Sequence, residues 1–423
     1  MSFNIALTGL NAANQDLDVT ANNLANAQTV GFKGSRTEFA DLYASTQAGV
    51  SATTAGNGVA VSEIAQQFTQ GNIETTGNNL DLAINGNGFF TVSQDGSLQY
   101  TRDGEFQLNS SGDVVTASGQ NLQVYPPLSN GNFNTGGLQN LVLNTGEGAP
   151  AATTTASLTA NLPADATPPA DAANFSPTDP NSYNDTTSLT VYDSLGAAHT
   201  ATMYFTNTGA GTWNAYMYVD GQPVNPDANG VATPQTLTYN SATGTLDATT
   251  STNAADTTGT VNFGSYQPAT GASPLNIEVN LLNTTQYGGN FDVTAVDQNG
   301  YTTGQLTGIS IGSTGIVQAQ YTNGQAVNLG QVAMANFANP QGLQQLGNSS
   351  WSQTDTSGAP VMGTAGSSSF GSIESGSLEE SNVDTTSELV NMITAQRAFQ
   401  ANAQAIQTND QITQTIIQMT QSG

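Results

Sequence analysis

Apolar side chains recur at alternating steps of three and four residues near both ends of this 423-residue chain. The N-terminal set is Phe3, Leu7, Leu10, Asn14, Leu17, Ala21 and Leu24. The C-terminal set is Leu389, Met392, Gln396, Phe399, Ala403 and Ile406, and after a shift of about one place it continues through Ile412, Ile416 and Met419. A period of 3.5 residues places one seam along a helix and favours coiled-coil packing against a second helix. The pattern therefore predicts helical assembly segments within residues 1–33 and 371–423.

Helices of this size have little stability alone. Ordering about 24 backbone residues costs roughly 24–48 kcal/mol, whereas burying six apolar side chains contributes about 10–15 kcal/mol. Helical hydrogen bonds narrow this gap, but short helices remain marginal in water. We therefore expect the ends to be stabilised by several neighbouring helices, and copies of the same chain would supply them. The alternative is an intramolecular hairpin of the two ends.

Two polar residues on or beside these seams have more than one interpretation. Asn14 either fixes the register of a coiled coil or faces a water-filled lumen. Arg397 is the one basic residue of the C-terminal segment. It is either a solvated side chain or the partner of a carboxylate in another copy, with Asp16 and Asp18 as candidates. An exposed pair of this kind is worth about 0–1 kcal/mol and would mainly orient the subunits.

Composition excludes several classes of function. Four basic residues against thirty-one acidic ones give a net charge of −27, which argues against binding to nucleic acid or to an anionic membrane surface. No apolar run has the length that spans a bilayer. The chain has no cysteine, which excludes disulfides and thiolate metal sites. The first twenty residues lack the basic and apolar regions of a secretory signal, although a composition rich in Gly, Thr, Asn and Ser suits an extracellular protein.

Between the ends, turn signals and short alternating runs predict β structure. Residues 34–70 are expected to be an irregular connector, and residues 71–145 an antiparallel β segment. Within it, we expect a hairpin of Leu80–Ile84 and Phe89–Val92, and further turns at Asp95-Gly96, Asp103-Gly104 and Ser111-Gly112. Residues 145–185 contain six of the fifteen prolines and are expected to be linker or surface loops.

The remaining segments complete a nested arrangement. Residues 146–285 are expected to form an inserted β domain, and residues 286–370 to return to the first one. The predicted fold class is therefore multidomain, with terminal α-helical coiled-coil segments and mainly antiparallel all-β domains in the order helix, first β, second β, first β, helix.

No combination of residues predicts catalysis. His199 is the only histidine, so neither a catalytic triad nor a His-rich metal site can be completed, and we expect a surface or loop position for it. Glu379 and Glu380 are expected to begin the last helix, where acidic residues are favourable. Asp297 begins only a fragment of a calcium loop. The chain is therefore predicted to be neither an enzyme nor a cofactor or metal protein.

Three runs of sequence resemble the signatures of bacterial flagellar rod and hook proteins. They are residues 21–33 (ANNLANAQTVGFK), 378–384 (LEESNVD) and 392–402 (MITAQRAFQAN). On this resemblance the motif residues Asn22, Asn23, Asn26, Phe32 and Asn402 are added to the expected assembly residues. Residues 76–90 and 100–102 resemble the first outer domain of these proteins, and residues 304–311 and 329–340 its returning half. Residues 191–196 (VYDSLG) resemble a motif of the outermost hook domain, which favours hook over rod.

The resemblance implies a non-enzymatic subunit that assembles into a homopolymer, a curved tube acting as a universal joint between rod and filament. It also implies contacts with rod, hook cap and hook–filament junction proteins, and with the flagellar export apparatus. The implied location is extracellular, after export without a cleaved signal peptide. The alternatives are another axial protein, such as a distal rod or hook-associated protein, and a secreted β-rich adhesin.

Overall fold

The computed structural model describes residues 2–42, 56–143, 146–248, 259–367 and 369–421. Two compact units are defined by contacts along the chain. The first comprises Met1–Thr145, Gly308–Gln320 and Ala326–Gly423, and the second comprises Gly146–Thr307 and Tyr321–Gln325. Each unit has its own hydrophobic core.

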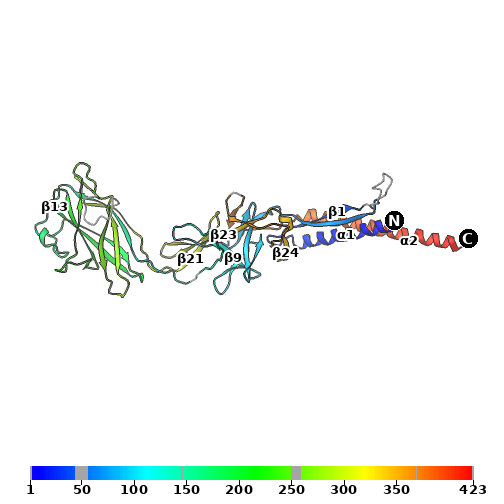
Figure 1. The fold of residues 1–423 in the computed structure, drawn as a ribbon, viewed down its shortest axis with the longest axis horizontal. Helices are drawn as coiled ribbons and strands as arrows, with labels where there is room; N and C mark the ends of the chain where they lie inside the picture. The colour runs from blue at the N-terminus through cyan, green and yellow to red at the C-terminus, as the bar shows by residue number, and fades with distance from the viewer. Residues whose placement is uncertain (1, 43–55, 144–145, 249–258, 368, 422–423) are drawn as a thin grey trace. The chain divides into compact units, whose positions relative to one another are not determined.

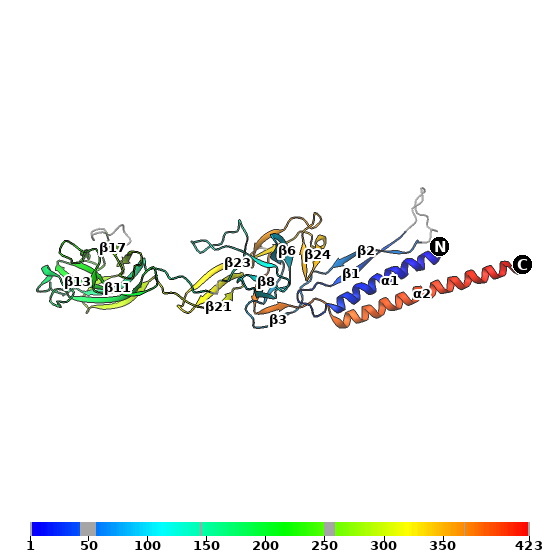
Figure 2. The same cartoon turned by 90° about the horizontal axis from the view of Figure 1, so that it is seen from below.

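The first unit contains a helix at each end of the chain, α1 (Ser2–Ala25) and α2 (Thr385–Gln421). The helices lie side by side and antiparallel (Figures 1 and 2), with Gly9 opposite Asn402 and Asn23 opposite Glu388. Asp384 caps α2, because its Oδ1 accepts a hydrogen bond from the Ser387 backbone N–H at 2.7 Å. Neither helix, over its described residues, is both long and apolar enough to cross a membrane.

A β-hairpin follows α1, in a stretch that was expected to be an irregular connector. Strands β1 (Ser35–Asp41) and β2 (Val59–Gln66) pair antiparallel from Ser35↔Gln66 to Asp41↔Val59. Residues 43–55 between them lie outside the described residues. The hairpin packs along α1 (Figure 2). A bulge between Glu38 and Phe39 interrupts the alternation of β1, so the stretch has no regular period-two pattern.

Most of the β structure of the first unit belongs to one hydrogen-bonded network of twelve strands among the described residues, in the main order β21-β22-β23-β9-β5-β6-β25-β24. The strands are β5 (Phe89–Gln94), β6 (Ser97–Thr101), β7 (Phe106–Leu108), β8 (Val114–Thr116), β9 (Asn121–Tyr125), β10 (Gln139–Asn140), β21 (Leu306–Ile311), β22 (Ile316–Tyr321), β23 (Ala326–Asn336), β24 (Gln344–Gly347), β25 (Ser350–Ser352) and β26 (Val361–Thr364). A short 3₁₀ helix, η2 (Pro340–Gly342), precedes β24. Large apolar side chains from these strands form the core, including Phe90, Phe106, Leu122 and Val332.

The predicted hairpin of Leu80–Ile84 and Phe89–Val92 is wrong. Strand β4 (Leu82–Asn85) instead pairs with the distant β27 (Ser372–Ser375), while β5 pairs with β6. The intervening Gly86 and Gly88 have φ values of +115° and +123°, and these turn the chain into a different sheet rather than back on itself. The predicted turn at Asp95-Gly96 is confirmed, because Gln94 pairs with Ser97 across it.

Two short strand pairs join the segment after β2 to the segment before α2. One is the β4–β27 pair, and the other joins β3 (Ile73–Thr75) to β28 (Ser377–Glu379). Both are antiparallel, and both join segments that are about 300 residues apart in sequence. The segment leading to α2 is therefore held directly against the segment that follows β2.

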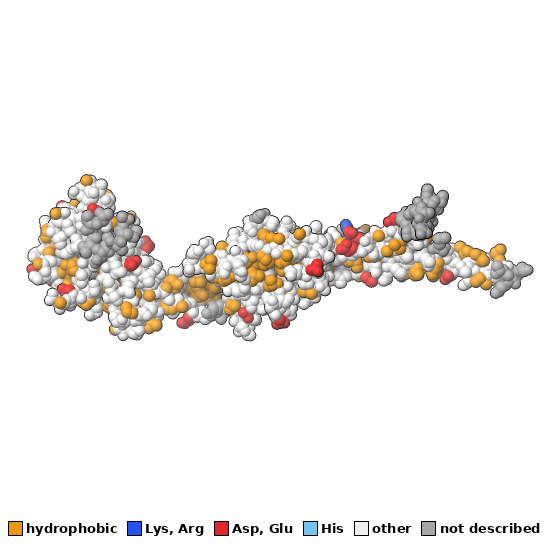
Figure 3. Space-filling model, in the orientation of Figure 1, with side chains coloured by type: hydrophobic (Ala, Val, Ile, Leu, Met, Phe, Trp, Pro, Cys, Tyr) orange, Lys and Arg blue, Asp and Glu red, His pale blue; other side chains and the backbone are white. Residues whose placement is uncertain are grey.

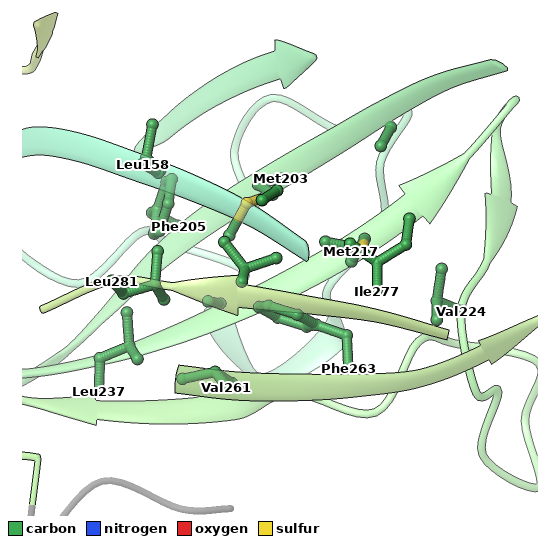
Figure 4. Close-up of a cluster of buried hydrophobic side chains, with 14 of the residues drawn as sticks. Leu158, Met203, Phe205, Met217, Val224, Leu237, Val261, Phe263, Ile277 and Leu281 are labelled. Carbon is green, nitrogen blue, oxygen red and sulfur yellow. The ribbon is translucent and has the colours of Figure 1, made fainter. Parts of the chain in front are cut away.

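The second unit consists of two five-stranded sheets among the described residues. One contains β11 (Thr155–Pro163), β17 (Thr260–Tyr266), β18 (Leu275–Asn280), β19 (Thr285–Tyr287) and β20 (Asp292–Gln298). The other contains β12 (Asp185–Tyr192), β13 (Ala198–Gly209), β14 (Thr212–Val219), β15 (Gln222–Pro223) and β16 (Gln235–Thr238), and η1 (Ala172–Asn174) precedes it. Figure 4 shows side chains from both sheets gathered in one core, among them Phe205, Met217 and Phe263. Within the described part of this unit, the strand pairings are antiparallel except those of β11 with β18 and β19.

Strand β11 corrects the expectation that residues 145–185 are linker or surface loops. Its burial alternates along its length, with Ala156, Leu158, Ala160 and Leu162 buried. Proline-rich neighbouring residues hid this period-two signal. Because β11 pairs with three other strands, it is a central element of its sheet.

His199 is buried, which corrects the expected surface or loop position. Its Nδ1 lies 2.6 Å from Asp220 Oδ2, and its Nε2 lies 3.2 Å from Asp193 Oδ2. Burial by itself would lower the pKa of His199, but hydrogen bonds and charges from Asp220 and Asp193 outweigh burial and raise the pKa above 6.5. Asp193 also accepts hydrogen bonds from Thr270 Oγ1 and the Ala197 backbone N–H. Despite the burial cost, these bonds lower its pKa to about 2. His199 therefore connects the turn at Asp193 to the turn at Asp220 through hydrogen bonds.

This histidine predicts how the stability of the second unit depends on pH. A raised folded-state pKa contributes stability that is complete below pH 6.5 and is lost as pH rises through the folded-state pKa. We expect the urea midpoint of the second unit to decrease as the pH is raised from about 6 through the folded-state pKa of His199. Fluorescence of Trp213 in a Trp351→Phe background measures it, because Trp213 is buried in this unit. His199→Gln should remove the pH dependence over this range, and an unchanged dependence in that variant would contradict the assignment.

Candidate assembly surface of the terminal helices

The contact between α1 and α2 is built from small side chains. Ala6 and Ala13 of α1 and Ala395 of α2 are buried. Gly9 lies against Asn402, where an added Cβ would come within 2.8 Å of the Asn402 side-chain oxygen. Small residues at this spacing let two helices approach closely. The two helices of one chain therefore approach most closely at small side chains, and not at the exposed members of the predicted seams.

The N-terminal apolar set from Phe3 to Leu24, which we call the N-terminal stripe, lies beside that contact. At 100° per residue it is turned roughly 70° around α1 from the row of Ala6, Gly9 and Ala13. Phe3 and Leu7 are 45% and 39% exposed. The rest of the stripe is also accessible in part, with Leu10, Leu17 and Leu24 half-buried and Asn14 and Ala21 exposed. The Asn14 amide donates to Asp18 Oδ2 at 3.4 Å.

The C-terminal stripe has the same relation to the contact, turned roughly 70° around α2 from Ala395. Leu389 is 47% exposed, and Gln396 is exposed. The half-buried members are Met392, Phe399, Ala403 and Ile406. Because the helices are antiparallel and both stripes are turned in the same sense, they lie on one side of the helix pair. Together they form a broad surface, which we call the leucine face.

On the other side of the pair, the β1–β2 hairpin packs along α1. Gly58, the residue before β2, approaches α1 so closely that an added Cβ would lie 2.1 Å from Thr8 Oγ1. Ala12 is buried on this side. The hairpin thus covers part of α1 on one side of the helix pair, and the leucine face is left open. Helix α2 also extends beyond α1 (Figure 2), and its end carries exposed apolar side chains (Figure 3), including Ile412, Ile416 and Met419.

A buried cluster of three charged side chains links the segment after α1 and the segment before α2 to the β structure. Lys33 Nζ lies 2.6 Å from Glu379 Oε1, and Arg102 lies 3.0 Å from Glu379 Oε2. The Glu379 side chain has no exposed surface, and that of Lys33 has none either. Lys33 follows α1, Arg102 follows β6, and Glu379 ends β28. We call this cluster the charged triad.

Further hydrogen bonds complete the triad. Lys33 Nζ donates to the Thr69 carbonyl at 2.9 Å, and Arg102 donates to the Gly86 carbonyl at 2.8 Å. The Gly71 backbone N–H donates to Glu379 Oε1 at 2.8 Å. Burial lowers the pKa of Lys33 and of Arg102, and in each case Glu379 opposes this shift. A single carboxylate therefore holds two buried cations that belong to different segments.

The triad overturns one expectation from the sequence. Glu379 and Glu380 were expected to begin the last helix, but Glu379 lies in β28 and α2 begins at Thr385. No sequence motif predicted the triad. The available signal was the scarcity of basic residues, since two of only four are buried on this one carboxylate.

The motif residues of the first signature have structural roles near the same junction. Phe32 is buried. The buried Asn23 amide donates to the Ser35 carbonyl and to Glu388 Oε1, both at 2.7 Å. Asn22 is exposed, and its carbonyl accepts a hydrogen bond from the Asn26 amide. Asn23 therefore ties α1 to β1 and to α2.

The described residues contain no group of three or more His, Asp or Glu side chains placed to hold a metal ion. Asp297 lies in β20. The terminal region therefore consists of an open leucine face, a small-residue contact and a buried charged triad, all of which are structural features.

Comparison with known proteins identifies the family. The family models that match are the flagella basal body rod protein at residues 3–33, the flagellar hook protein FlgE/F/G D1 domain at 83–176, the flagellar basal body protein FlaE D2 domain at 161–301, and the flagellar basal body rod FlgEFG protein C-terminal at 374–419. Over 412 residues, 96% of each chain, the sequence is 40% identical to the flagellar hook protein FlgE of Escherichia coli K12. The chain belongs to the flagellar hook protein family.

Other hook proteins agree over nearly the whole length. The hook protein FlgE of Salmonella typhimurium is 39% identical over 96% of each chain, and that of Treponema pallidum is 31% identical over 95% of each chain. The resemblance found in the sequence is thereby confirmed, and so is the preference for hook. This family consists of structural subunits of the flagellar hook rather than enzymes.

The crystal structure of Helicobacter pylori flagellar hook protein FlgE2 is similar in fold, with a TM-score of 0.50 and 14% identity. The match covers 71% of this chain and 99% of that one. It supports the fold over the matched part of the chain.

Proposed function

We propose that this hook protein self-assembles through its terminal helices into a curved, flexible tube that transmits torque from rod to filament. In this proposal the leucine face of each copy packs by coiled-coil contacts against helices of neighbouring copies. The observation that supports it is the open leucine face itself, which runs along both helices on the side that β1–β2 does not cover. Isolated helix pairs seldom leave this much apolar surface exposed without a partner.

The expected assembly residues enter this proposal with two separate roles. The stripe residues, from Phe3 to Leu24 and from Leu389 to Ile416, would make contacts between copies. Asn23, Phe32 and Asn402 make contacts within the chain, and would set the orientation in which each copy presents its leucine face.

We propose further that the β segments form outer layers around a helical inner tube, in a nested order of helix, first β, inserted β, first β, helix. The expected boundaries are a first β domain of residues 71–145 and 286–370 and an insertion of residues 146–285. Head-to-tail contacts between unlike surfaces do not close on themselves, and they generate an open helical polymer.

Family membership supports the remaining partners as proposals. They are the rod, the hook cap, the hook–filament junction proteins and the flagellar export apparatus, with an extracellular location after export without a cleaved signal peptide. Co-purification of these components with assembled hooks would test each contact.

A substitution on the leucine face tests the assembly mechanism. Leu7→Gln places a polar amide on the stripe, and burial of a leucine is worth about 1.5–3 kcal/mol. Because Leu7 is already partly buried, we expect the critical concentration for polymerisation to rise about tenfold. Sedimentation of purified protein measures it, and electron microscopy identifies the tubes.

The matched control is Leu195→Gln, which makes the same change at an exposed leucine of the second unit. It should leave the critical concentration within about twofold of wild type. Equal effects of the two substitutions would contradict a specific role for the leucine face. Failure of the wild-type protein to form tubes would contradict the proposed function as a whole.

A further inference from the structure

A second surface feature of the terminal region is polar. A groove of about 520 Å³ runs where α1, α2 and β1 meet. We call it the polar groove and define it by Asp16, Thr20, Thr37, Asp384, Glu388 and Asn391. It lies between the two helices on the hairpin side, whereas the leucine face lies on the other side.

The polar groove contains carboxylates that have no cationic partner among the described residues. Asp16 takes part in none of the ion pairs found among the described residues. Glu388 accepts only neutral amide donors, from Asn23 at 2.7 Å and from Asn391 at 3.1 Å. Arg36 also borders the groove, but its guanidinium lies 2.8 Å from Glu38.

Hydrogen-bonding capacity in the groove is also unused. Thr37 is buried, and its hydroxyl has no hydrogen-bond partner among the described residues. Asp384 uses one carboxylate oxygen to cap α2. A donor-rich cation entering the groove would therefore meet carboxylates and polar side chains rather than an apolar wall.

Among the described residues, one basic side chain takes part in no ion pair. Of its four basic residues, Lys33 and Arg102 are buried on Glu379, and Arg36 is paired with Glu38. Arg397 is exposed, and no ion pair joins it to another described residue. At 100° per residue it is turned roughly 200° from Ala395, so it faces away from α1. In the described structure Arg397 makes no ion pair with the groove of its own chain, although Thr394, one turn before it on α2, lines that groove.

We propose that Arg397 of one copy enters the polar groove of the next copy and donates hydrogen bonds to Asp16. This inference rests on the proposed self-assembly and specifies one of its contacts. Charge complementarity supports it, because a polymer of this acidic chain contains few cations and Arg397 is the one that the described structure leaves unpaired. Donor and acceptor lie on different faces of the helix pair. The contact is therefore head-to-tail and compatible with an open polymer.

Charge reversal tests the pairing. Arg397→Glu should raise the critical concentration for polymerisation about tenfold, because it places like charges together at the contact. The double variant Asp16→Arg with Arg397→Asp restores opposite charges and should return the critical concentration to within about threefold of wild type. Gln400→Glu, which adds a negative charge to an exposed site one turn away, is the matched control. Unfolding midpoints of the monomers check that all variants fold.

Cross-linking gives an independent measurement, because the chain has no cysteine. Ser387→Cys at the edge of the groove and Gln400→Cys near Arg397 are made as separate variants and mixed before polymerisation. A short bifunctional thiol reagent should link the two variants to each other in the polymer, and not in dilute monomer. Heterodimers detected only in the polymer would support the contact.

The inference is overturned if Arg397→Glu polymerises like wild type, or if the polymer yields no cross-linked heterodimer. These results differ from failure of the proposed function, in which the wild-type protein itself forms no tubes. Normal wild-type tubes with unaffected Arg397→Glu would leave the leucine face in place and remove only this contact.

Discussion

Glu379→Gln should destabilise the first unit by about 3–5 kcal/mol, because it removes the single carboxylate that two buried cations share. A neutral amide cannot compensate the charges of Lys33 and Arg102. Removing one partner of a buried ion pair costs more than replacing the whole group, since uncompensated charge remains in the interior. Urea unfolding of the monomer, followed by the fluorescence of Trp351, measures the loss.

Trp351 reports on the first unit, where it is buried against Phe89 and Phe68. The second tryptophan, Trp213, lies in the second unit and is replaced by Phe in the background. This replacement breaks no hydrogen bond found among the described residues, because Trp213 Nε1 has no partner there.

Glu380→Gln is the matched control for Glu379→Gln. Glu380 is exposed, and its carboxylate accepts one hydrogen bond from the Asn72 amide at 3.2 Å. Its replacement should change stability by less than about 0.5 kcal/mol. Equal losses in the two variants would contradict the role assigned to the triad.

The pH dependence of Glu379→Gln provides a second check. Burial lowers the folded-state pKa of Lys33 below 10.5. For such a group the unfolded chain binds more protons between the two pKa values, so stability rises with pH across that interval. Without Glu379 to oppose the shift, the loss should become smaller as pH rises toward 10.5.

Gly104→Ala should destabilise the first unit by about 3 kcal/mol, at the upper end of the range for overpacking. A Cβ at this position would lie 1.7 Å from the Leu82 carbonyl oxygen and 3.2 Å from the Phe90 ring. The first contact is with backbone, which cannot move aside as a side chain can. β4 would have to shift and would lose the hydrogen bond from the Leu82 N–H to the Gly104 carbonyl, now 3.0 Å. The Trp351 signal measures this loss too.

Gly308→Ala is the control for Gly104→Ala. A Cβ at Gly308 would meet no heavy atom within 4 Å, and neither glycine is among those with positive φ. Replacing glycine in a compatible conformation restricts the unfolded chain and stabilises a protein by about 0.4–1 kcal/mol. We therefore expect opposite signs for the two substitutions. A loss at Gly104 no larger than the change at Gly308 would contradict the close approach of the two backbones.

Local patterns predicted those parts of the fold that depend on short-range periodicity. Both helices were found from their apolar spacing, and the turn at Asp95-Gly96 from its dipeptide. The hairpin predicted for Leu80–Ile84 failed because its strand β4 has its partner almost 300 residues further along the chain. A turn signal shows that the chain bends, but it does not show which strand will accept the hydrogen bonds.

For the candidate assembly surface too, the sequence predicted some features and not others. Heptad spacing identified the stripe residues, because that pattern is a property of one helix and is visible in the sequence. It did not show that the two helices of one chain meet through Ala6, Gly9 and Ala395 instead. Close packing of small residues, with the hairpin on one side, is what leaves the leucine face open.

By itself, the sequence determined that both ends are amphipathic helices, that the interior is β structure, and that the chain is a flagellar hook protein relative. The tertiary structure alone decided which side of the helix pair is open and what holds it in place. The charged triad shows the reason: Lys33, Arg102 and Glu379 are separated by up to 346 residues, and no local pattern links them. Only folding brings them to within hydrogen-bonding distance, where two cations and one carboxylate can be buried together.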